Sequence, residues 1–268
     1  MASRVVGYGL CVSPFVAALG YEAFVSAMPW SERTVPTSAG GVVTRSKRRP
    51  PPIGTVTYPA GRILLEWCLR DAGLMRGGDV VEIGAGTGVC AIGLARAVGD
   101  ARVVVAVDEC DESLENLEGN VRANRVSNVR CVRETPSLET VTHVVAADVV
   151  YDGAGSLDLD RLLLEGRRAK LVLVDRWSGG WFAAVTGVAG VAAPSSTTDP
   201  AIAAFERSLA ATVLRVDRPD PGEVAAVRDA VFSTLTPTEA GLWRLLGTFE
   251  MMRFYDLRLD DDDDDCRR

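Results

Sequence analysis

A glycine-rich segment between a predicted strand and a predicted helix is the first feature of this sequence that could do chemistry. It runs from Val80 to Gly88 and reads VVEIGAGTG. Glycine lets the backbone turn tightly and approach a ligand closely, and free N–H groups at a helix start favour an acceptor or an anion. Twenty residues after Gly88, the next predicted strand ends at Asp108, whose carboxylate is placed to accept both hydroxyls of a ribose. A glycine loop followed by an acid indicates a site for a nucleoside cofactor.

Two cofactor classes use such a loop, and the neighbouring residues separate them. A dinucleotide fingerprint expects Gly or Ala where this chain has Val89. Glu82 stands two residues ahead of Gly84, and a G-x-G-x-G segment with a leading acid resembles the first motif of the S-adenosylmethionine-dependent methyltransferases. In that family the loop supports the amino acid end of the cofactor, which carries no pyrophosphate.

Three further segments narrow the resemblance. Residues 114–124, LENLEGNVRAN, are similar to the L-x-N-L-x-x-N-x-x-x-N helix of the methyltransferase-like 21 group, also called methyltransferase family 16. The fourth predicted strand ends in ADVVY, residues 147–151, which resembles the D-x-x-Y signature of that group. Tyr58 and Pro59 stand where the family has a Trp-Pro pair, so Tyr58 replaces the tryptophan. The family's Trp-Gly pair after the third strand is absent, and residues Arg133 to Thr135 occupy that neighbourhood. Together these motifs span about residues 54–152.

The resemblance implies a cofactor, a reaction and roles for individual residues. Most members of the family methylate lysine side chains of proteins with S-adenosylmethionine. The resemblance places Asp148 and Tyr151 at the acceptor as catalytic residues, where they would orient an amine that must lose a proton before it attacks. The residues that would bind the cofactor lie in or near the glycine loop, after the second and fourth strands and before the first helix; they are Glu82, Gly84, Ala85, Gly86, Asp108, Ala147 and Tyr58.

The composition argues against several other classes of function. His143 is the sole histidine and would have to serve any Ser/His/Asp triad, although its place in a predicted strand favours a packing role. The six cysteines form no C-x-x-C pair, so we expect neither a metal site nor disulfides, and a reducing compartment fits them. A net charge of −7 and a pI near 4.9 disfavour nucleic acid as a partner. Methyl transfer from a sulfonium needs alignment and exclusion of water more than acids and bases.

The hydrophobic pattern predicts an α/β fold of parallel strands joined by crossover helices. With the resemblance, we expect a seven-stranded class I methyltransferase (Rossmann-like) sheet with helices on both faces. The predicted strands are residues 79–83, 102–107, 129–132, 141–147, 171–174, 213–216 and 249–257. The first predicted helix carries an apolar stripe from Ile63 to Leu74 and ends near Gly77 and Gly78. The other predicted helices are residues 89–98, 111–124, 157–166 and a segment around Phe205.

The chain divides into three predicted parts. Residues 1–53 form a variable N-terminal extension with a basic, proline-rich linker, residues 54–259 form the methyltransferase domain, and residues 260–268 form an acidic, disordered tail. The apolar segment from Val5 to Trp30 could also serve for targeting, although Pro14 and Glu22 weaken a membrane span. We expect a cytoplasmic monomer, with mitochondrial or nuclear alternatives. Its partner would be a protein substrate that carries the target lysine, with neither membrane nor nucleic acid involved.

Three alternative functions stay open at this point. A small-molecule N-methyltransferase would share the cofactor half of the fold and differ by a closed pocket. A degenerate methyltransferase would bind partners without catalysis, and failure to bind the cofactor would reveal it. An NAD-dependent oxidoreductase comes last because of Val89.

Overall fold

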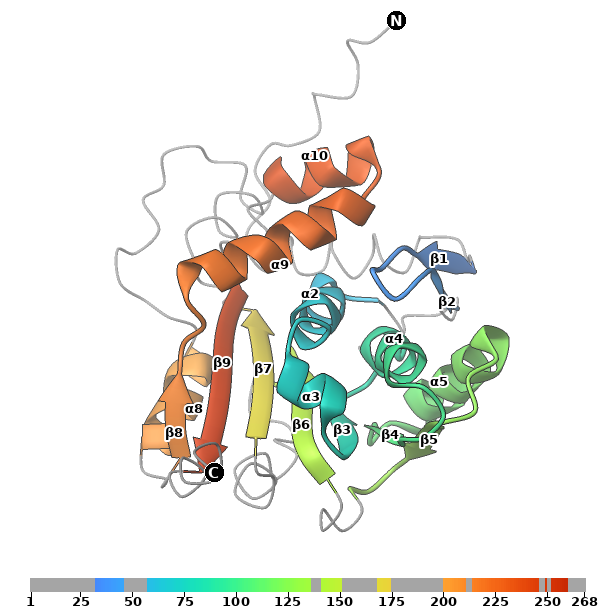
Figure 1. The fold of residues 1–268 in the computed structure, drawn as a ribbon, viewed down its shortest axis with the longest axis horizontal. Helices are drawn as coiled ribbons and strands as arrows, with labels where there is room; N and C mark the ends of the chain where they lie inside the picture. Colours follow the sequence, from blue (N-terminus) through green and yellow to red (C-terminus); the bar gives the residue numbers. More distant parts are fainter. Residues whose placement is uncertain are drawn as a thin grey trace, which may run out of the picture.

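The structure is a computed structural model that describes residues 32–45, 57–135, 141–150, 168–174, 200–210, 214–245, 249 and 252–259 of the 268-residue chain. Seven strands form one sheet in the spatial order β5-β4-β3-β6-β7-β9-β8 (Figure 1). They are β3 Asp79–Ile83, β4 Val104–Val107, β5 Val129–Val132, β6 Val141–Ala147, β7 Arg168–Val174, β8 Leu214–Asp217 and β9 Met252–Leu259. β9 is antiparallel to β7 and β8, and the other neighbouring strands are parallel. The predicted seven-stranded α/β sheet is therefore confirmed.

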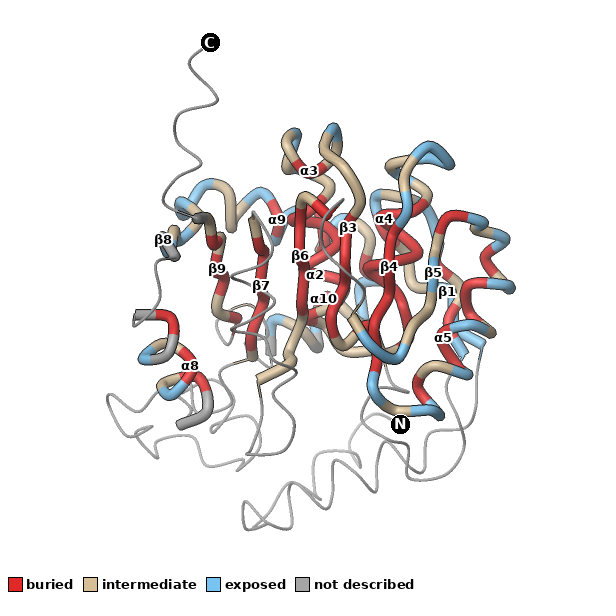
Figure 2. The backbone as a smooth tube through the Cα atoms, turned by 90° about the horizontal axis from the view of Figure 1, so that it is seen from below, coloured by how far each residue is buried: buried red, intermediate tan, exposed pale blue. Residues whose placement is uncertain are grey.

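Helices pack on both faces of this sheet and complete two separate cores. They are α2 Pro59–Cys68, α3 Ala72–Arg76, α4 Val89–Val98, α5 Asp111–Asn124, α8 Pro200–Ala210, α9 Pro221–Thr234 and α10 Pro237–Leu245. Val80 of β3 belongs to the core that includes α2, α4, α5 and α9, whereas Val81 belongs to the core that includes α8. Successive side chains of a strand point to opposite faces, so β3 is buried on both sides, and Figure 2 shows the central strands as buried.

A short antiparallel hairpin precedes the sheet in the chain. It consists of β1 Arg33–Val35 and β2 Val42–Thr44 (blue in Figure 1). Val42 is fully buried in the core that includes α2 and α4. The hairpin is not predicted by the sequence pattern, and it packs on the domain whose start we predict at residue 54. That boundary remains a prediction.

The prediction of a single helix that ends near Gly77 and Gly78 is wrong, because the chain forms two helices there. α2 begins with Pro59 in its first turn, where the resemblance to the family places the opening of the first helix, and it ends at Cys68. Asp71 then caps α3, since its Oδ1 accepts the N–H groups of Gly73 at 2.8 Å and Leu74 at 3.0 Å. The predicted helix over residues 157–166 and the predicted acidic tail lie outside the described residues.

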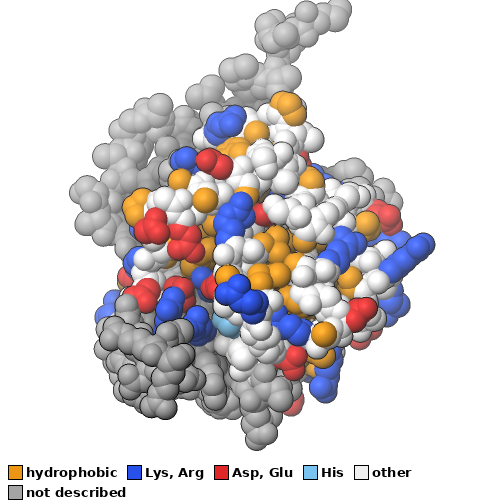
Figure 3. Space-filling model, viewed as in Figure 1, with side chains coloured by type: hydrophobic (Ala, Val, Ile, Leu, Met, Phe, Trp, Pro, Cys, Tyr) orange, Lys and Arg blue, Asp and Glu red, His pale blue; other side chains and the backbone are white. Residues whose placement is uncertain are grey.

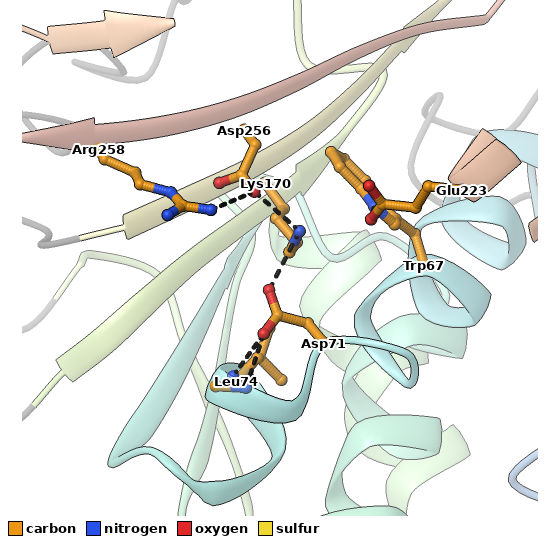
Figure 4. Close-up of polar contacts among 8 residues, drawn as sticks. Trp67, Asp71, Leu74, Lys170, Glu223, Asp256 and Arg258 are labelled. Carbon is orange, nitrogen blue, oxygen red and sulfur yellow. Dashed lines mark hydrogen bonds and ion pairs between the residues drawn. The ribbon is translucent and has the colours of Figure 1, made fainter. Parts of the chain in front are cut away.

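A buried polar network joins α2, α3, β7 and β9 on the face of the sheet that these helices cover (Figure 4). Lys170 Nζ lies 3.1 Å from Asp71 Oδ2, 3.2 Å from Asp256 Oδ2 and 4.1 Å from the ring centre of Trp67. Trp67 Nε1 in turn donates to Glu223 Oε1 at 2.5 Å. Burial alone would lower the pKa of Lys170, but the two carboxylates outweigh it and the pKa lies above its ordinary value. The lysine is thus held as an ammonium inside the fold.

On the surface, side chains of both charges are interspersed with hydrophobic ones over the face shown in Figure 3. None of the helices in the described part of the chain is long and apolar enough to cross a membrane. Within the same residues, no three His, Cys, Asp or Glu side chains gather in a way that could hold a metal ion.

Candidate active site

The glycine loop lies between the end of β3 and the start of α4, as predicted. Gly84, Gly86 and Gly88 have φ angles of 65°, 52° and 78°, in the left-handed region that favours glycine. A Cβ atom on Gly88 would come within 2.3 Å of Leu117 Cδ1. The loop therefore requires glycine for its backbone conformation and for the close approach of α5.

Three main-chain N–H groups of the loop already have partners. Ala85 N donates to Val107 O at 2.9 Å, Gly88 N donates to Ala85 O at 2.8 Å, and Gly86 N donates to Asp108 Oδ2 at 2.9 Å. The first and third of these bonds connect the loop to the end of β4. The parallel register of β3 and β4, which pairs Ile83 with Val107, brings the two strand ends together.

Asp108 follows β4 directly and lies against the loop. Its Oδ1 accepts the N–H of Cys110 at 3.1 Å, and the residue is buried. Burial raises the pKa of this carboxyl, although the hydrogen bonds from Cys110 and Gly86 act in the opposite direction. The predicted pairing of glycine loop and acid is thus present in space, with Asp108 linked to the loop by a hydrogen bond.

Glu82 is placed beneath the loop rather than in it. Its Oε2 accepts the N–H of Ala91 in the first turn of α4 at 2.7 Å, so it joins β3 to the helix that follows. Its burial raises the pKa to about 8, and nearby Asp108 adds to this effect while the bond from Ala91 opposes it. Contact of Glu82 with a cofactor remains a prediction.

Asp148 lies in the turn after β6, at the same edge of the sheet as the loop. Its φ is 52°, an angle that few residues other than glycine adopt, and its N–H donates to Val172 O at 2.8 Å. A Cβ atom on Gly84 would come within 2.6 Å of Val149 Cγ1, so the turn after β6 packs directly on the glycine loop. Residues in sparsely populated backbone regions cluster at functional sites. Ala147 ends β6 beside this turn.

Two predicted site residues, Tyr58 and Tyr151, and the sole histidine complete the comparison with the sequence predictions. Tyr58 immediately precedes α2 and is half-buried. The hydroxyl of its neighbour Thr57 lies 3.0 Å from that of Thr87, which places the start of α2 beside the glycine loop. Tyr151 lies outside the described residues. His143 is buried in β6, and burial lowers its pKa to about 4, in agreement with a packing role.

Two polar residues of α5 extend the site beyond the residues predicted for it. Ser113 and Asn116 are buried. The Ser113 hydroxyl interacts with the Asp108 carboxylate and helps to lower its pKa against the effect of burial, whereas Asn116 Nδ2 has no hydrogen-bond partner within the described residues. Buried polar atoms are seldom left without a partner, so Asn116 Nδ2 suggests a polar ligand next to the helix that follows Asp108. Polar residues on the buried side of an amphipathic helix are the sequence signal that could have indicated them.

Comparison with known proteins bears on the identity of this site. The family model described as lysine methyltransferase matches residues 45–172. Similar solved structures include a SAM-dependent methyltransferase from Aquifex aeolicus, at 16% identity over 60% of this chain and 86% of that chain, with a TM-score of 0.44. A ribosomal protein L11 methylase from Lactobacillus delbrueckii subsp. bulgaricus has 14% identity over 76% and 80% of the two chains, with a TM-score of 0.43.

A precorrin-6y C5,15-methyltransferase from Geobacter metallireducens has 13% identity over 59% of this chain and 73% of its own, with a TM-score of 0.39. No curated protein sequence gave a significant match. Since these TM-scores lie below 0.5, the assignment depends on the family match, which includes the glycine loop, Asp108 and Asp148. This match over residues 45–172 is to the same family that the sequence motifs resemble.

Proposed function

We propose that this protein transfers a methyl group from S-adenosylmethionine to the ε-amino group of a lysine in a protein substrate. The observation that carries the proposal is the contact between the turn that holds Asp148 and the glycine loop that ends β3. This contact supports the proposal, because Asp148, to which we assign the acceptor, directly precedes Val149 in that turn. The family match, described as lysine methyltransferase, covers both.

The residues around the loop fit S-adenosylmethionine. Asp108 offers carboxylate oxygens of the kind that accept ribose hydroxyls, and its burial strengthens such bonds because the local dielectric constant is low. Gly84 and Gly86 have left-handed φ angles, and neither adds a side chain to the loop that could block a ligand. Asn116 Nδ2, which has no hydrogen-bond partner among the described residues, offers a further polar contact.

At the acceptor, Asp148 would orient the lysine and remove its proton. Lysine has an ordinary pKa of about 10.4, so its amine must be deprotonated before it can attack. S-adenosylmethionine, when bound, supplies a sulfonium methyl group: the amine nitrogen forms a bond to this carbon as the carbon–sulfur bond breaks. The proton that the nitrogen sheds passes to the Asp148 carboxylate or to water. Alignment of the two groups and exclusion of water account for most of the catalysis.

The test is to incubate the purified chain with a proteome and S-adenosylmethionine labelled in its methyl group. After acid hydrolysis of the protein fraction, we expect the label in methylated lysine. The variant Asp148→Asn should lower this labelling about 100-fold or more, while its affinity for S-adenosylmethionine stays within about threefold of wild type. Asparagine is the matched change because it also tolerates the left-handed backbone found at residue 148.

Two results would count against the proposal. Label confined to small molecules would favour a small-molecule N-methyltransferase. Binding of S-adenosylmethionine without any transfer would favour a methyltransferase fold that serves as a binding protein.

A further inference from the structure

One side of α5 carries a stripe of buried polar residues. They recur at intervals of three or four along the helix, so they share a face; they are Ser113, Asn116, Asn120 and Asn124. A buried amide needs partners for both its oxygen and its nitrogen. The stripe begins near the Asp108 turn and ends at the hairpin of β1 and β2, so it connects the proposed cofactor site with the N-terminal part of the chain.

Asn120 lies in the middle of the stripe and bonds in two directions. It is fully buried. Its Oδ1 accepts the N–H of Arg45 at 2.8 Å, and its Nδ2 donates to the main-chain carbonyl of Thr87 at 2.9 Å. The side chain therefore links the residue that follows β2 to the glycine loop.

The bond to Thr87 acts on a part of the loop that is flanked by two glycines. Thr87 stands between Gly86 and Gly88, which both have left-handed φ angles. Glycine loses more conformational freedom than any other residue when it becomes ordered, so a loop rich in glycine is costly to fix at the moment of binding. A hydrogen bond to the Thr87 carbonyl orients the Thr87–Gly88 peptide in advance.

A second contact ties the same region together. Thr57 Oγ1 lies 3.0 Å from Thr87 Oγ1 and donates to Thr44 Oγ1 at 3.4 Å. Thr44 and Thr87 are both buried. Polar groups from three places therefore support Thr87 of the loop: Thr44 of the hairpin through Thr57 just before α2, and Asn120 of α5.

We propose that Asn120 is a positioning residue for the cofactor loop: it holds the Thr87 carbonyl so that the loop is ordered before the cofactor binds. This inference rests on the proposed function, because it assigns the loop to S-adenosylmethionine. Pre-ordering of a binding loop raises affinity by lowering the conformational cost of binding. Asn120 itself has no direct role in the transfer.

Asn124 provides a matched control on the same face of the same helix. Its Oδ1 accepts the N–H of Val43 at 2.9 Å, and its Nδ2 donates to Val43 O at 2.6 Å. Like Asn120 it holds the hairpin, but its bonds go to Val43, Arg96 and the Asn120 carbonyl rather than to the loop. A loss of stability that comes only from the hairpin should therefore appear in both variants.

The experiment compares wild type, Asn120→Ala, Asn120→Asp and Asn124→Ala as full chains at a temperature where each is folded by circular dichroism. Asn120→Asp keeps an oxygen for Arg45 N but loses the donor to Thr87 O. Hydrogen exchange of residues 84–89 is measured without cofactor, and the Kd of S-adenosylmethionine is measured by calorimetry. We expect both Asn120 variants to exchange these amides at least about tenfold faster and to bind about tenfold more weakly, the effect of losing roughly 1.4 kcal/mol.

Asn124→Ala should stay within about threefold of wild type in both measurements. Equal loop exchange and equal Kd in the Asn120 and Asn124 variants would overturn the inference, because hairpin docking alone would then explain the contact. Absence of binding by folded wild type would instead contradict the proposed function, and this inference with it. If Asn120→Ala does not fold, the hydrogen exchange of residues 84–89 in Asn120→Asp, compared with that in Asn124→Ala, tests the inference in its place.

Discussion

At the scale of single residues, the buried carboxyl of Glu82 should give the protein a specific pH dependence. Its pKa rises from 4.5 to about 8 in the fold, chiefly through burial. The folded state therefore holds a proton that the unfolded state has lost between these two values, so this group's contribution to the free energy of unfolding falls as pH rises through that window.

Glu82→Gln keeps an oxygen for the N–H of Ala91 but cannot ionise. Relative to wild type, we expect this variant to become progressively more stable between about pH 5 and the folded pKa of about 8. Urea unfolding at several pH values measures the difference. The exposed Glu118→Gln serves as the control, and a Glu82→Gln curve parallel to wild type would show that Glu82 does not carry the raised pKa.

The left-handed backbone of Asp148 leads to a second prediction at this scale. In ordinary helix or strand positions, Ala is more stable than Gly by roughly 0.5–1 kcal/mol. At a φ of 52° the Cβ of alanine is penalised, so Asp148→Gly should be more stable than Asp148→Ala by about 1 kcal/mol. Denaturant unfolding of the two variants checks the order, and the reverse order would show that residue 148 does not adopt this backbone conformation.

At the scale of elements, the network around Lys170 holds the C-terminal strand to the sheet. Lys170 lies in β7, Asp71 caps α3 and Asp256 lies in β9, and all three side chains are less than one-fifth exposed. Lys170→Met would remove the cation that Asp71 and Asp256 share, although Asp256 would keep its ion pair with Arg258 Nη2 at 3.4 Å. We expect a cost of about 3 kcal/mol in the free energy of unfolding.

Urea unfolding near pH 7 measures this cost. Arg122→Met, which breaks an exposed pair with Glu118, is the matched control and should cost less than about 0.5 kcal/mol. A cost for Lys170→Met as small as that of the control would show that the network contributes little to stability.

The destabilisation by Lys170→Met should shrink in acid. The pKa of Asp71 lies below its ordinary value, and the stability that its ionised form contributes is lost as pH falls through that pKa. Burial opposes this shift, but the bond from Leu74 N and the charge of Lys170 outweigh it.

The same elements show what the sequence could and could not predict. The bounds of β3, α4, α5, β5 and β6 agree with the predicted ranges, because apolar periodicity and glycine positions are local signals. β7 begins three residues earlier than predicted: Lys170 looks like a surface residue until Asp71 and Asp256, distant in the chain, neutralise it. The hairpin of β1 and β2 likewise depends on partners such as Asn124 far along the sequence.

In the candidate site, too, the locally encoded features are predictable from the sequence and the long-range contacts are not. The glycine loop and Asp108 are predictable because their residue types and spacing determine their chemistry, and the structure joins them by the Gly86–Asp108 bond. The role of Asn120 is not, since only the fold shows that its amide lies between Arg45 and Thr87. The helices α9 and α10 came from a region with no predicted element.

At the scale of the whole molecule, the parallel strands bring three of the proposed site residues to one edge of the sheet. Gly84 follows β3, Asp108 follows β4 and Asp148 follows β6, and these three strands are adjacent. In open α/β sheets, ligands bind outside the carboxyl ends of such strands, where the order of the strands reverses. β3 stands at this reversal, between β4 and β6. We therefore expect S-adenosylmethionine to bind at this edge of the sheet.

The most direct test is calorimetric titration of S-adenosylmethionine into the full chain, with Asp108→Ala and Asp220→Ala beside it. Both aspartates accept two main-chain N–H bonds, but Asp220 caps α9 on the outside of the molecule. We predict micromolar binding by wild type and by Asp220→Ala, and a loss of at least about tenfold in Asp108→Ala. No binding by the folded wild type, or equal binding by the two variants, would contradict the account.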